Sequence, residues 1–137
     1  MRTVFLGSFV LLIITLSGCS GTLDPAEGYY SYQAYDQSGR LVVTGLLRFD
    51  KLDIDGVKGS WQMNNVNGSE RTGISEAFGV FEGFLKGDAL YLNLNPGWVD
   101  NNVILQGMQT SGGFEGDWAY IGFPGVLNQG KFKAFHE

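Results

Sequence analysis

The sequence has 137 residues and a formal net charge of −5, and its only cysteine stands near the N-terminus. This length suffices for one globular domain and not for two. The 9 basic residues form no cluster, which argues against a nucleic-acid partner, because such a partner requires a basic surface. With one cysteine no internal disulfide is available, so the core must stabilise the domain.

The N-terminal residues have the pattern of a secretory leader. Arg2 supplies a positive charge, and residues 4–16 form an apolar run shorter than the ~20 residues that a membrane-spanning helix needs. Small residues and the cysteine follow in the order Leu16-Ser17-Gly18-Cys19. This order resembles the lipobox of bacterial lipoproteins. The resemblance implies that residues 1–18 are removed and that Cys19 is lipidated; an ordinary signal peptide and a membrane helix are the alternatives.

The same resemblance implies a location. A lipidated Cys19 would anchor the protein to a membrane of the bacterial cell envelope, and Ser20 in place of an aspartate implies the outer membrane if the source is Gram-negative. The scarcity of basic residues makes electrostatic binding to anionic lipid unexpected, so acyl chains are the expected attachment. We interpret residues 19–27 as the lipidated cysteine and a polar tether, and residues 28–137 as the domain.

The domain sequence predicts strands and no helix. Short alternating runs are separated by glycine, asparagine and aspartate, which is typical of a β-meander. Eight strands are expected, at residues 28–35, 40–49, 57–64, 75–85, 89–94, 101–109, 114–121 and 130–135. Closure would remove both exposed edges, so an all-β fold, a single antiparallel up-and-down β-barrel of about eight strands, is favoured. A β-sandwich is the alternative, although it usually needs longer links.

A glycine two residues before an aromatic residue recurs within the expected strands. It occurs as Gly59-Ser60-Trp61, Gly79-Val80-Phe81, Gly116-Asp117-Trp118 and Gly130-Lys131-Phe132. Because side chains alternate along a strand, each glycine shares a face with its aromatic ring. Acidic residues occupy the other face of the strand at 114–121, so the aromatic face should point inward. An inward glycine lets a strand coil and leaves a gap that a neighbouring ring can fill.

These rings admit two interpretations. Trp61, Phe81, Trp118 and Phe132 either line a cavity for a small apolar ligand or fill the core. Gly59-Ser60-Trp61 is similar to the Gly-x-Trp motif of lipocalins and avidins. The resemblance implies a lipocalin-like or avidin-like meander barrel, and we transfer no binding residue from it.

Two of the expected loops contain an aromatic residue. Trp98 lies in the loop at residues 93–102, and Phe123 lies in an apolar loop at residues 122–127. The links after the fifth and seventh strands of an up-and-down barrel lie at the same end. Trp98 and Phe123 are therefore expected to flank one opening and to contact a ligand or an envelope protein.

The sequence contains no coherent catalytic set. His136 is the only histidine and stands next to the C-terminus, and the aspartates at 50, 53 and 55 do not have calcium-loop spacing. Glu82 and Glu115 are expected on the outer face, where solvent disfavours acid catalysis. We therefore expect no enzyme, metal or cofactor. Non-catalytic binding of a small apolar ligand inside the barrel is the first hypothesis, and a structural or protein-interaction lipoprotein with a filled core is the alternative.

Overall fold

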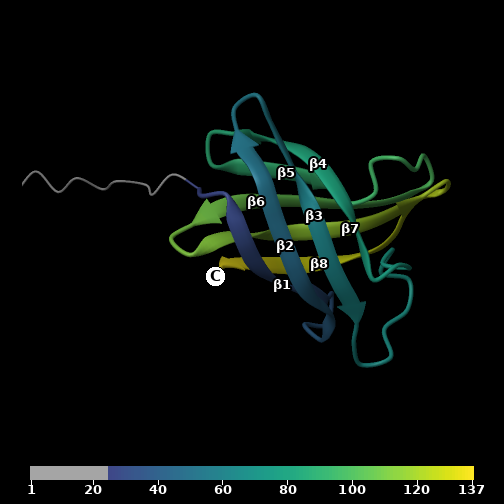
Figure 1. Ribbon diagram of the computed structural model, residues 1–137. Coiled ribbons are helices and arrows are strands. Elements are labelled where there is room, and N and C mark those ends of the chain that lie inside the picture. Colours follow the sequence, from purple (N-terminus) through teal and green to yellow (C-terminus); the bar gives the residue numbers. More distant parts are fainter. Residues whose placement is uncertain (1–24) are drawn as a thin grey trace, which may run out of the picture.

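The computed structural model describes residues 25–137 (Figure 1). The expected leader at residues 1–18, the lipidation site Cys19 and residues 20–24 lie outside the described part. Within residues 25–137 no helix is long and apolar enough to cross a membrane.

Eight strands follow one another with no helix between them in the described chain. They are β1 (Gly28–Asp36), β2 (Leu41–Asp53), β3 (Gly56–Asn65), β4 (Phe78–Lys86), β5 (Ala89–Asn93), β6 (Asn101–Thr110), β7 (Gly113–Gly122) and β8 (Gly125–His136). Each strand pairs with the next in antiparallel fashion, and β1 pairs with β8 to close a barrel. The expected up-and-down barrel is confirmed, and the sandwich alternative is wrong.

The strand boundaries differ from the expectation by more than two residues in three places. β2 continues to Asp53 instead of residue 49, with an irregular register between Phe49 and Lys51. β8 begins at Gly125 instead of residue 130, because β7 and β8 stay paired as far as Gly122 and Gly125, leaving a turn of residues 123–124. The apolar loop expected at residues 122–127 is therefore mostly a hairpin. β4 begins at Phe78 instead of residue 75, because the preceding residues belong to a long loop at residues 66–77.

Because side chains alternate along each strand, every second side chain points into the barrel. The buried apolar residues include Tyr30, Tyr32, Leu47, Phe49, Trp61, Met63, Phe81, Leu92, Leu105, Phe114, Trp118 and Phe132. The eight described strands close on one another around this core and leave no free edge. We therefore expect residues 25–137 to fold on their own.

The up-and-down order gives the barrel two distinct ends (Figure 1). The N-terminal end contains the start of β1, the C-terminus and the tight turns after β2, β4 and β6. The opposite end, here named the loop end, contains the links after β1, β3, β5 and β7, including the long loop at residues 66–77. The tether thus joins the barrel at the end away from the long loops.

Candidate functional site

The glycine–aromatic repeats pair with one another across the sheet. Trp61 lies opposite Gly79 and Phe81 opposite Gly59 in the β3–β4 pair. In the β7–β8 pair the same reciprocal arrangement joins two further repeats, with Trp118 opposite Gly130 and Phe132 opposite Gly116. The sheet therefore contains two similar crossed pairs, and in three of the four cases the ring lies over the glycine with which its residue is paired.

The rings occupy the space that the glycines leave. A Cβ added to Gly79 would lie 2.5 Å from Cζ2 of Trp61, and one added to Gly59 would lie 2.4 Å from Cζ of Phe81. Phe132 fills the corresponding gap at Gly107, where an added Cβ would lie 2.7 Å from its Cζ. The prediction that neighbouring rings fill the glycine gaps is confirmed at Gly59, Gly79 and Gly130, whereas at Gly116 the backbone of β6 fills the space.

Both buried indole groups are held by backbone carbonyls. Nε1 of Trp61 donates to the carbonyl of Leu94 at 2.7 Å, and Nε1 of Trp118 donates to the carbonyl of Tyr35 at 2.8 Å. These bonds satisfy polar groups that would otherwise be buried without a partner. They also fix the orientation of each ring, Trp61 against the residue that follows β5 and Trp118 against β1.

At the loop end, the loop at residues 66–77 crosses the barrel from β3 toward the opposite wall. Its Ile74 is part of the core and its Thr72 is buried. The site of a Cβ added to Gly73 lies 2.4 Å from Val103 of β6 and 2.7 Å from Tyr120 of β7. The crossing loop thus covers this end of the interior, and a pocket of about 350 Å³ lies between the loop and Trp98.

The side chain of Asn65 holds the crossing loop in place. Its Nδ2 donates to the carbonyl of Ile74 at 2.8 Å, and its Oδ1 accepts a hydrogen bond from the Thr72 hydroxyl. We predict that Asn65→Ala lowers the free energy of unfolding by about 1–2 kcal/mol, because both loop partners lose a bond. Amide hydrogen exchange should become faster in residues 66–77. Asn64→Ala, at the exposed neighbouring position, is the control and should change neither quantity.

At the N-terminal end, aromatic rings close the interior. The ring of Tyr30 lies 4.9 Å from that of Phe49 and 4.8 Å from that of His136. The Tyr30 hydroxyl donates to the carbonyl of Ala26 at 2.7 Å, which joins the end of the tether to the barrel. His136 therefore packs against this aromatic end.

The candidate ligand residues named from the sequence separate into two groups. Trp61, Phe81, Trp118 and Phe132 lie together inside the barrel, each with at most 4 % of its surface exposed. Trp98 and Phe123 lie on links at the loop end and are 64 % and 94 % exposed. The structure thus brings the first four together as tightly packed core, and the other two lie apart from them.

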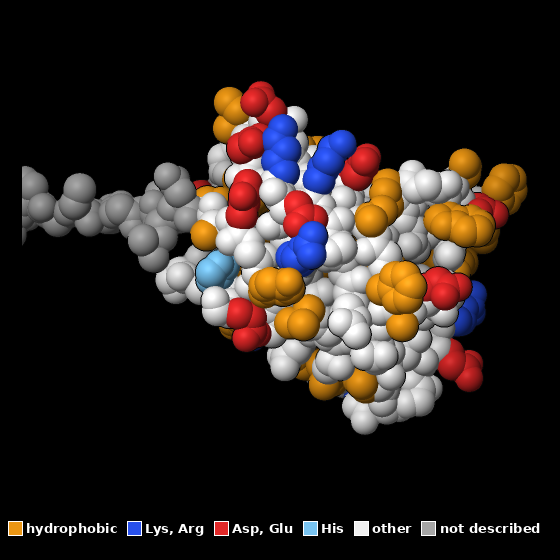
Figure 2. Space-filling view, viewed as in Figure 1, with side chains coloured by type: hydrophobic (Ala, Val, Ile, Leu, Met, Phe, Trp, Pro, Cys, Tyr) orange, Lys and Arg blue, Asp and Glu red, His pale blue; other side chains and the backbone are white. Residues whose placement is uncertain are grey.

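The exposed pair has an apolar neighbour. Val99 follows Trp98 and is 97 % exposed. The two links meet where Asn101 at the start of β6 pairs with Gly122 at the end of β7. Figure 2 shows several hydrophobic side chains at this end of the molecule, on the right of the view. We name Trp98, Val99 and Phe123 the apolar tips.

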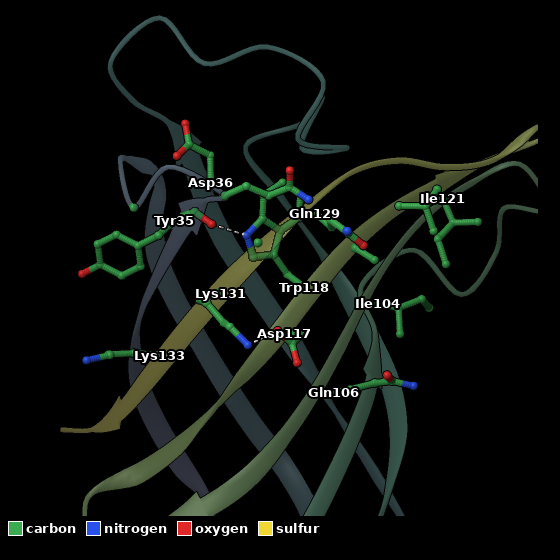
Figure 3. A pocket seen from close by; sticks show the side chains of 15 residues that line it. Tyr35, Asp36, Ile104, Gln106, Asp117, Trp118, Ile121, Gln129, Lys131 and Lys133 are labelled. Atoms are coloured by element: carbon green, nitrogen blue, oxygen red, sulfur yellow. Dashed lines mark hydrogen bonds and ion pairs between the residues drawn. The ribbon is translucent and has the colours of Figure 1, made fainter.

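A groove of about 1040 Å³ runs along the outer wall over β6, β7 and β8 and reaches the β1–β2 turn (Figure 3). Its floor follows two rows of paired residues across the strands. One row contains Ile104, Ala119 and Gln129, and the next contains Gln106, Asp117 and Lys131. Nζ of Lys131 lies 2.5 Å from Oδ1 of Asp117.

The sequence did not predict this groove. Outward positions of a strand are expected to be solvated, and the rows become visible only when the register across β6, β7 and β8 is known. The one signal in the sequence was the apolar character of Ile104 and Ile121 at positions that alternate with the buried Leu105 and the half-buried Tyr120.

The fully buried Tyr32 makes stability depend on pH. Burial raises the pKa of Tyr32 above its ordinary value of 10.0. Folding favours the neutral form of Tyr32. The stability that depends on this neutral form is therefore fully present below pH 10 and is lost as the pH rises above that value. We predict that the free energy of unfolding falls above pH 10 by up to about 1.4 kcal/mol per pH unit for this group. Denaturation of wild type and Tyr32→Phe between pH 8 and 12 checks this, since the variant should fall less steeply.

The acidic residues considered for catalysis lie where the sequence placed them. Glu82 and Glu115 are both exposed on the outer wall, and Glu82 lies 3.8 Å from Nζ of Lys58. In the part of the chain that the structure describes, no three histidine, cysteine or acidic residues are grouped so as to hold a metal ion.

Comparison of the chain with protein-family models, with curated proteins and with solved structures gives no significant match.

Proposed function

We propose that this protein is a non-catalytic interaction module, a lipid-anchored envelope lipoprotein that binds a partner protein through its apolar tips. The observation that carries the proposal is the exposure of Trp98, Val99 and Phe123 at the end opposite the tether. Clustered apolar side chains on a solvent-exposed protein surface are typical of a protein–protein contact. Tryptophan is also among the residues that contribute most binding energy at such contacts.

The packing of the interior is the reason to favour this function over a small apolar ligand inside the barrel. The rings that would line a cavity lie against glycines of the neighbouring strands, and Ile74 occupies the loop end. A ligand of ordinary size needs about 300 Å³ or more. An interior ligand would therefore have to displace core side chains, whereas the apolar tips are free to make contacts.

The position of the tether supports the same arrangement. Residue 25 and the start of β1 lie at the N-terminal end, and the apolar tips lie at the loop end. A chain anchored through Cys19 would thus present its tips away from the membrane that holds it. The anchor has its own test, in which Cys19→Ser should abolish incorporation of labelled palmitate and leave unprocessed precursor. Normal processing of that variant would contradict the anchor.

Site-specific photocrosslinking in the native host tests the proposed contact. A photoreactive phenylalanine analogue is placed at position 98 or 123, with position 54 as the control. Ile54 is 89 % exposed in the turn after β2, at the other end of the barrel. We expect the same discrete crosslinked species from positions 98 and 123 and none from position 54. Equal crosslinking from all three positions, or none from 98 and 123, would contradict the proposal.

A further inference from the structure

We propose that the outer groove over β6, β7 and β8 is a second binding site, which takes a single-chain fatty acid with its carboxylate at Lys133. The proposal concerns the barrel wall and not the apolar tips, so it stands independently of the proposed function. It rests on the size of the groove, on the order of its lining residues and on its charge.

The size fits a single-chain ligand. The groove encloses about 1040 Å³, at the upper end of what small-molecule sites offer. Along β8 it extends from Lys133 to Val126, which corresponds to about 23 Å at the usual rise per residue. An elongated apolar chain matches this shape better than a compact molecule.

Polarity changes along the groove. Lys133 and Lys131 lie toward one end, and Ile121 and Val126 lie toward the other, with Ala119 between them on the floor. Figure 3 shows Lys131 and Lys133 on one side of the view and Ile121 on the far side. A ligand that fits both ends must therefore have a polar head and an apolar tail.

The charged end favours an anionic head. Asp117 is engaged by Lys131, and Asp36, the last residue of β1, is engaged by Arg40 at 3.2 Å. Lys133 lies opposite Glu115 in the β7–β8 pair, yet in the described chain no ion pair joins them. Lys133 is thus a cation that a carboxylate can pair with. The protein as a whole has a net charge of −5, so this local positive charge distinguishes the polar end of the groove from the rest of the surface. It favours an anionic head group at that end.

Calorimetric titration with laurate, below its micelle concentration, tests the site on the chain from residue 20 onward. That chain retains every described strand. Dodecyltrimethylammonium, which has the same tail and the opposite charge, is the head-group control. We expect laurate to bind at least about tenfold more tightly than this cation. Amide NMR shifts on laurate addition should centre on Ala119 and Lys131.

Two variants locate the site further. Ala119→Phe fills the groove floor, and Lys133→Glu reverses the charge at the head end; each should weaken laurate binding at least about tenfold. Ile54→Glu and Lys86→Glu are the matched controls at exposed positions outside the groove, and binding should be unchanged in both. A thermal melt of each variant confirms that the barrel is folded. Absence of laurate binding, equal binding of the cation, or full binding by folded Ala119→Phe would overturn the proposal.

Discussion

Trp61→Ala is expected to lower the free energy of unfolding by about 3–5 kcal/mol. The side chain is 4 % exposed and lies over Gly79, so its removal leaves a cavity that the neighbouring strand has no side chain to fill. The carbonyl of Leu94 also loses the indole donor at 2.7 Å. A loss of this size is a large part of the 5–15 kcal/mol that an ordinary domain has.

Trp98→Ala is the matched control, because the same residue type is 64 % exposed there. We expect its effect to stay within about 0.5 kcal/mol. Equilibrium unfolding in urea at pH 7 measures both variants against wild type. If the two tryptophans had similar effects, the assignment of Trp61 to a packed core would be wrong. The crosslinking experiment should show the reverse order, since Trp98 belongs to the apolar tips.

Gly116→Ala is expected to destabilise the barrel by about 3 kcal/mol. A Cβ at this position would lie 2.1 Å from the carbonyl oxygen of Gln106 and 2.5 Å from Cα of Gly107. Both atoms belong to the backbone of β6, so a side-chain rotation does not relieve the contact. The β6–β7 pair would have to separate, and the ring of Phe132 would lose its place over Gly107.

Gly112→Ala is the control for that substitution. Gly112 lies in the turn between β6 and β7 and has no atom within 4 Å of the added Cβ, so the change should stay within about 0.5 kcal/mol. Thermal and urea denaturation of the two variants give the comparison. Equal stability of Gly116→Ala and wild type would contradict the close approach of β6 and β7.

Much of the fold was predictable because its determinants are local. Alternation in short runs gave the strands, and turn residues such as those at 54–55 gave hairpins of the right length. The glycine–aromatic spacing placed Trp61 and Trp118 inside, since their acidic or polar neighbours must face water. Closure followed from the cost of free edges.

The site was less predictable because it depends on contacts between distant residues. Nothing in the polar sequence of residues 66–77 indicates that Ile74 reaches the core, or that Gly73 lies against β6 and β7. The groove likewise needs the register of three strands to bring Ile104, Ala119 and Gln129 into one row. Sequence alone also left open whether the aromatic rings line a cavity, because small barrels use such rings in both ways.

A crystal structure of the protein purified from its native host without extraction of lipids tests most directly whether the core is filled. We predict that the space between Trp61, Phe81, Trp118 and Phe132 holds protein side chains alone, with Ile74 at the loop end. Continuous non-protein electron density among these four rings would contradict it and would place the binding site inside the barrel.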